Sequence, residues 1–110
     1  METELLKIVV YTPLDAADSV RRALGEAGAG KIGNYDMCSF STRGIGRFRP
    51  NSDANPHIGV ANKLEEVEEE RIETICPKEK LDDVLKAIKD VHPYEEPAVD
   101  IYPLLNLGQI

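Results

Sequence analysis

Two segments with helical periodicity, each directly preceded by a strand-like segment, constrain the fold of this chain more than any other feature. Residues 5–12 are rich in β-branched side chains, which predicts a strand, and residues 15–27 carry apolar side chains at helical spacing. The same order recurs later, because residues 66–76 have the composition of a strand and residues 78–90 carry a sharp helical stripe. Residues 98–102 predict a final strand.

A glycine-rich stretch, residues 28–49, follows the first predicted helix. Within it, residues 35–42 alternate between two faces and predict the second strand. Gly44 and Gly46 permit a tight reversal, which predicts a β-hairpin directly after that strand. The glutamate-rich start of the next segment also allows a helix, but the β-branched residues before Pro77 favour one long strand.

The order strand, helix, strand, strand, helix, strand predicts an α+β fold, a ferredoxin-like βαββαβ sandwich with the hairpin added after strand two. Right-handed crossovers place both helices on one face, the first strand in a central position, and strands two and three side by side. Cys38 and Cys76 are then expected to be neighbouring, reduced thiols. The chain is expected to form a single domain, residues 1–110.

Charge and hydropathy exclude several classes of partner. Thirteen basic and twenty acidic residues give a net charge of −7, which opposes the phosphate neutralisation needed for nucleic-acid binding. The longest apolar runs are far shorter than the ~20 residues that span a bilayer, and the N-terminus is acidic where a signal peptide would be basic. We therefore expect no nucleic acid and no membrane as partners, and a cytoplasmic location.

The most chemically suggestive string is HPYEEP, residues 92–97, because imidazole and carboxylate groups suit a divalent metal and a proline-bounded, extended segment can present alternate side chains to one site. A second polar string, residues 34–36, opens the predicted second strand. The two strings belong to opposite sheet edges, so they would meet only between two copies of the chain. The candidate ligand-binding residues are Asn34, Tyr35, Asp36, His92, Tyr94 and Glu95.

A divalent metal cation is the cofactor that this residue set would suit, with His92, Glu95 and Asp36 as ligands. Each group also has an ordinary structural interpretation. Asn and Asp satisfy turn backbone through local hydrogen bonds, and the acids of residues 92–97 can be solvated at the entry to a strand.

Three strings carry a resemblance to a known family: KIGNYDMCSFSTRGIGRFRP followed by NPHIG, the acidic strand ending in RIETICP, and HPYEEPAVDIYPL. They resemble the insert domain of YqfO-type members of the NGG-interacting-factor-three-like family, a domain related in fold to PII and CutA proteins. The resemblance implies a PII/CutA-like fold, a tendency to self-associate and no established reaction. Full-length members carry this domain between two lobes with a dinuclear metal site, whereas this stand-alone chain has only His57 and His92 as histidines.

Two functions follow from these observations. The favoured one is a non-enzymatic, homo-oligomeric binding or regulatory module of PII/CutA type, because no nucleophile stands beside a base. The CutA resemblance favours a trimer, with a dimer next, and a protein carrying the family's metal-binding lobes is a further expected partner. The alternative is a metal-binding protein or metal-dependent hydrolase that uses His92 and nearby carboxylates.

Overall fold

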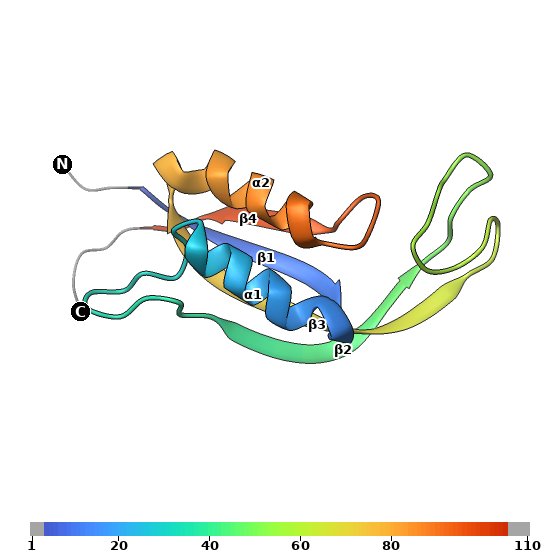
Figure 1. The fold of residues 1–110 in the computed structure, drawn as a ribbon, viewed down its shortest axis with the longest axis horizontal. Coiled ribbons are helices and arrows are strands. Elements are labelled where there is room, and N and C mark those ends of the chain that lie inside the picture. Colours follow the sequence, from blue (N-terminus) through green and yellow to red (C-terminus); the bar gives the residue numbers. More distant parts are fainter. Residues whose placement is uncertain (1–3, 106–110) are drawn as a thin grey trace.

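A computed structural model describes residues 4–105 and shows a four-stranded sheet covered on one face by two helices (Figure 1). Short 3-10 turns, Leu14–Ala16 and Lys78–Lys80, precede the two helices. The elements in chain order are β1 (Leu5–Pro13), α1 (Ala17–Glu26), β2 (Phe40–Phe48), β3 (Glu65–Pro77), α2 (Leu81–Val91) and β4 (Val99–Pro103).

The strand order is β2-β3-β1-β4, and every neighbouring pair is antiparallel. The first strand is therefore central, strands two and three are adjacent, and both helices lie on one face (Figure 1). This is the ferredoxin-like fold that the sequence predicts. The prediction of one long strand over the glutamate-rich segment is also confirmed, because β3 pairs with β1 from Pro77 to Glu69 and with β2 from Glu73 to Glu65.

The core lies between the sheet and the helices, and alternate residues of β1 and β3 supply its sheet side. Its buried members are Leu6, Ile8, Val10, Ala17, Val20, Leu24, Ala29, Ile72, Cys76, Val84 and Ile88. A charged pair lies at one end of this layer, where Arg21 Nη1 on α1 is 2.6 Å from Oε1 of the nearly buried Glu70 on β3. Cys38 is a free thiol outside the strands, and its carbonyl oxygen accepts a 2.7 Å hydrogen bond from the Thr74 hydroxyl.

The second strand begins at Phe40, later than the predicted start near residue 35. The preceding residues form a folded loop, because the Gly30 N–H donates to the Ile75 carbonyl at 2.7 Å and the Cys38 N–H donates to the Gly30 carbonyl at 2.9 Å. Gly30 has φ +81°, and a Cβ there would lie 2.5 Å from the Cys38 carbonyl oxygen. Only glycine fits this contact, so the loop is fixed by backbone bonds that the strand pattern of the sequence does not reveal.

The predicted reversal at Gly44 and Gly46 is wrong. Both glycines lie inside β2, paired with Glu69 and Val67 of β3. The nine residue pairs between β2 and β3 outweigh the local turn propensity of glycine. The loop that connects the two strands therefore consists of residues 49–64. The hairpin added to the fold is therefore the distal part of β2 and β3, an arm that extends beyond the helices (Figure 1).

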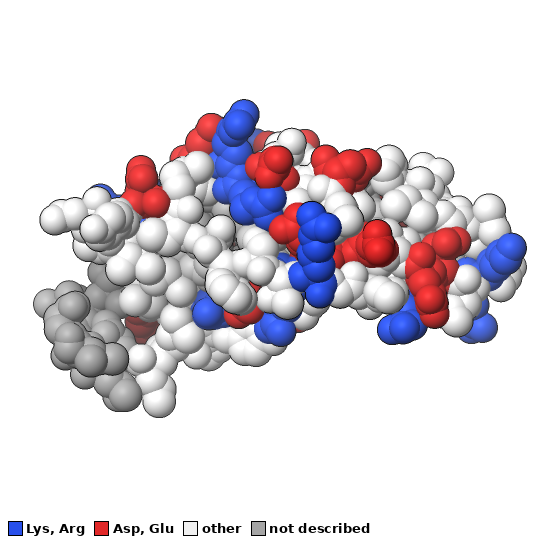
Figure 2. Space-filling view, turned by 90° about the horizontal axis from the view of Figure 1, so that it is seen from below, with Lys and Arg blue, Asp and Glu red and all other residues white. Residues whose placement is uncertain are grey.

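Acidic and basic side chains are interspersed on the face seen in Figure 2, including along the arm. One such pair joins the two strands of the arm, with Arg47 Nε 3.2 Å from Glu66 Oε1. Among the described residues, no helix is long and apolar enough to cross a membrane.

Candidate functional site

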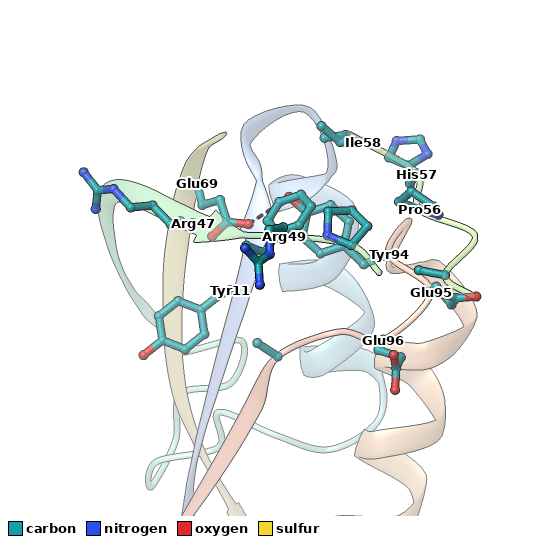
Figure 3. Close-up of a pocket in the computed structure, with 15 residues that line it drawn as sticks. Tyr11, Arg47, Arg49, Pro56, His57, Ile58, Glu69, Tyr94, Glu95 and Glu96 are labelled. Carbon is teal, nitrogen blue, oxygen red and sulfur yellow. Dashed lines mark hydrogen bonds between the residues drawn. The ribbon is translucent and has the colours of Figure 1, made fainter. Parts of the chain in front are cut away.

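A pocket of about 440 Å³ lies where the arm meets the segment that links α2 to β4 (Figure 3). Its walls come from the end of β2, the loop after it, the middle of β3 and residues 94–98. The lining residues are Tyr11, Gly46, Arg47, Phe48, Arg49, Pro50, Ala54, Pro56, His57, Ile58, Glu69, Tyr94, Glu95, Glu96 and Ala98.

His92 does not line the pocket, but its ring holds in place the start of residues 92–98, the segment that forms one wall. Helix α2 ends at Val91, and His92 turns extended ahead of Pro93, with φ −73° and ψ 132°. Its Nε2 lies 2.7 Å from the Tyr11 carbonyl oxygen, and its Nδ1 accepts the Tyr94 N–H at 3.1 Å. These two bonds require the neutral tautomer with the proton on Nε2, because a carbonyl can only accept. Burial lowers the pKa of His92, which favours the same neutral form.

Tyr94 projects from this segment toward the arm. Its hydroxyl donates to Glu69 Oε2 at 2.8 Å, and its ring lies 6.0 Å from the Phe48 ring, centroid to centroid (Figure 3). Burial, followed by the hydrogen bond to Glu69, raises the pKa of Tyr94 well above its ordinary value. The phenol therefore stays protonated and acts as a permanent donor to the carboxylate.

Glu69 is only 8% exposed, although it belongs to a run of glutamates. Its carboxylate lies over Gly46 on the neighbouring strand, and a Cβ at Gly46 would collide with Oε1 of Glu69. Gly44, two residues earlier on the same strand, has open space at the corresponding position. The glycine at residue 46 thus provides the space in which a buried carboxylate sits.

A second contact ties the loop after β2 to residues 92–98. The backbone N–H of Asn55 donates to both carboxylate oxygens of Glu95, at 3.2 and 3.3 Å. Arg49 is exposed and lines the pocket, whereas Arg47 extends outward, where it pairs with Glu66 (Figure 3). The site therefore combines aromatic walls and the buried carboxylate of Glu69 with a rim of exposed charged residues, among them Arg49, Glu95 and Glu96.

The residues predicted from sequence separate into two groups. Tyr94 and Glu95 line the pocket, and His92 lies behind Tyr94 with both ring nitrogens in internal hydrogen bonds. Residues 34–36 are exposed in the loop whose Cys38 carbonyl meets Thr74. Thr74 pairs with Ile8, three residues along β1 from the Tyr11 carbonyl that His92 contacts, so the points where the two groups attach to the sheet are about 10 Å apart along that strand.

The described residues contain no group of three His, Cys, Asp or Glu side chains placed to hold a metal ion. A metal at His92 would have to displace one of its two hydrogen bonds. Metal binding by His92, Glu95 and Asp36 stays a prediction that needs a second copy of the chain to supply Asp36.

Sequence reasoning missed the arm side of the pocket: Gly46, Phe48, Arg49 and Glu69. The available signal was the alternation of residues 40–48, which is compatible with a strand that continues through both glycines. A strand through residues 40–48, paired with the acidic strand that follows it in the sequence, would have placed one of the glutamates next to a glycine.

Comparison with known proteins shows what the chain resembles. It is 50% identical over 105 residues to a Halalkalibacterium halodurans protein named GTP cyclohydrolase 1 type 2 homolog, covering 96% of this chain and 28% of that protein. It superposes on a Bacillus cereus protein related to NIF3 with a TM-score of 0.82 and 49% identity, covering 93% of this chain and 26% of the other. The chain spans about a quarter of the length of these relatives.

A more distant likeness concerns the fold alone. The periplasmic divalent cation tolerance protein CutA of Archaeoglobus fulgidus superposes with a TM-score of 0.67 at 20% identity, covering 91% of this chain and 83% of that protein. No family model matches the chain.

Proposed function

We propose that this chain, which belongs to the NGG-interacting-factor-three-like family, is a non-enzymatic binding or regulatory module that works as a homo-oligomer. The chain is a PII/CutA-like module by its homologues and its fold. The relatives' name, GTP cyclohydrolase 1 type 2 homolog, belongs to proteins of which this chain spans about a quarter, and we assign no such reaction to it.

The observation that carries the binding proposal is the pocket between the arm and residues 92–98. Its volume of about 440 Å³ lies within the ~300–1,000 Å³ typical of small-molecule sites, and its walls are mostly apolar with a few placed polar groups. The buried carboxylate of Glu69, held by Tyr94, is such a group. Tyr94 and Glu95 are the predicted site residues that line this pocket.

Self-association is supported by the surface that the sheet leaves uncovered. β2 is an edge strand, and large apolar side chains stand exposed on it, with Phe40 69% and Ile45 55% exposed. A neighbouring copy that covers this edge would bury them. We favour a trimer over a dimer on the likeness to CutA, and such an assembly would let residues 34–36 of one copy approach Tyr94 and Glu95 of another.

The alternative is a metal-binding protein or metal-dependent hydrolase that uses His92 and nearby carboxylates. Residues 4–105 of one copy bring no three such ligands together, so this alternative needs a second copy to complete the site. Elemental analysis of untagged protein tests this alternative directly. Stoichiometric metal retained after purification supports it, and metal-free protein that gives no calorimetric signal with Zn²⁺ or Mn²⁺ removes it.

The binding proposal is tested by thermal melting with nucleoside triphosphates, free amino acids and divalent cations as three sets of probes. Gly46→Val should abolish any stabilisation, because its side chain needs the space of the Glu69 carboxylate, whereas Gly44→Val should keep it. A response that survives in Gly46→Val, or no response to any set, contradicts the proposed site. Light scattering that shows a monomer at micromolar concentration contradicts the proposed assembly.

A further inference from the structure

The carboxylate of Glu69 is poorly compensated for a group so deeply placed. It is 8% exposed, yet within residues 4–105 its side chain accepts one hydrogen bond, from the neutral phenol of Tyr94, and forms no ion pair. A buried charge with a single neutral donor is unfavourable compared with one that meets a cation. Because Glu69 lines the pocket, a cation that enters the pocket can reach its carboxylate.

A positive charge lines the same pocket without neutralising Glu69. Arg49 is an exposed residue that lines the pocket, and it forms no ion pair among the described residues. Two other arginines of β2 and β3 have partners elsewhere, since Arg47 pairs with Glu66 and Arg71 lies 3.9 Å from Glu73. The pocket thus presents the buried carboxylate of Glu69 and the guanidinium group of Arg49, which do not pair with each other, beside the exposed residues Glu95 and Glu96.

Flat and apolar groups line the same pocket. Phe48 and Tyr94 pack with their rings 6.0 Å apart and tilted by 55°, and Tyr11, Pro50 and Ile58 also line the pocket. Such walls bury apolar and aromatic groups and add favourable ring contacts. A ligand that satisfies the whole pocket carries an ammonium group, a carboxylate and an apolar or aromatic body.

Building on the proposed binding function, we infer that the pocket binds a small zwitterion, a free amino acid with an apolar or aromatic side chain. Its ammonium group donates to Glu69, its carboxylate accepts from Arg49, and its side chain lies against Phe48 and Tyr94. The hydrogen bond that Tyr94 donates to Glu69 holds the carboxylate in place for this contact.

The test is isothermal titration calorimetry of the full chain with three matched probes: L-phenylalanine, phenethylamine, which lacks the carboxylate, and 3-phenylpropanoate, which lacks the amine. L-phenylalanine should bind at least about 10-fold more tightly than either analogue, because a hydrogen bond to a charged group contributes about 10- to 100-fold in affinity. Glu69→Gln keeps an acceptor for Tyr94 and should weaken L-phenylalanine by about 10- to 100-fold without affecting 3-phenylpropanoate. Arg49→Gln should weaken L-phenylalanine and leave phenethylamine unchanged.

Two variants serve as controls, Glu68→Gln beside the key carboxylate and Arg22→Gln on the exposed face of α1, and both should bind as the unmodified chain does. Absence of binding by L-phenylalanine, or equal affinity in Glu69→Gln, overturns the zwitterion inference. If a nucleotide or cation instead binds in a manner that Gly46→Val abolishes, the inference fails while the proposed binding site stands. If no nucleoside triphosphate, amino acid or divalent cation binds, the zwitterion inference and the proposed binding site both fail.

Discussion

Replacing His92 by leucine should loosen the segment that forms one wall of the pocket. Leucine keeps an apolar side chain in the buried position but removes both ring nitrogens, so the Tyr11 carbonyl loses a donor at 2.7 Å and the Tyr94 N–H loses an acceptor at 3.1 Å. Two hydrogen bonds at about 1–1.5 kcal/mol each predict a loss of about 2–3 kcal/mol in the free energy of unfolding.

The assay is urea unfolding followed by circular dichroism at one fixed protein concentration, since association would add a concentration-dependent term. His57→Leu is the matched control, because His57 is exposed and its replacement should change stability by less than about 0.5 kcal/mol. A His92→Leu variant within about 0.5 kcal/mol of the unmodified chain would refute the conclusion that these two bonds hold residues 92–98 in place.

Three further predictions concern other buried groups. Because burial lowers the folded-state pKa of His92 below its ordinary 6.5, the unfolded chain binds the proton first as the pH falls. The contribution of His92 to the free energy of unfolding should therefore decrease as the pH drops through 6.5 toward the folded-state pKa and stay level below it. This pH dependence, measured from urea midpoints across the range, should be absent in His92→Leu. Arg21→Met leaves Glu70 without its cation and should cost about 2–4 kcal/mol in the same urea assay, whereas Arg21→Met combined with Glu70→Gln should recover part of that loss. A thiol-disulfide reagent should modify Cys38 in the folded protein but Cys76 only after unfolding, because Cys76 is fully buried and burial raises its pKa; equal rates measured by mass spectrometry would contradict this.

The sequence predicts the layers of this fold because periodicity is a local property. The helical stripe of residues 78–90 and the β-branched run of residues 5–12 identify α2 and β1, and the right-handed crossover then leaves one strand order. The course of β2 is different. Gly44 and Gly46 suit a turn or a strand equally well on local grounds, and their pairing with β3, about twenty residues later, decides between the two.

In the candidate site, too, local sequence identifies some residues and tertiary contacts decide the others. Tyr94 and Glu95 belong to an unusual proline-bounded string of the sequence, and both line the pocket because the chain bends at residues 94–96. Glu69 cannot be distinguished from four neighbouring glutamates by composition. Its burial follows from tertiary contacts, with Gly46 across the strand pair and with the Tyr94 hydroxyl 25 residues away.

The most direct measurement is a titration of ¹⁵N-labelled protein with L-phenylalanine, followed in ¹H–¹⁵N correlation spectra. We predict saturable shift changes that concentrate at residues 46–58, 69 and 94–98, the backbone that surrounds the pocket. In Glu69→Gln, the same changes should require about 10- to 100-fold more ligand. Unchanged spectra, or shift changes that bypass these residues, would contradict the conclusion that this pocket binds a zwitterion.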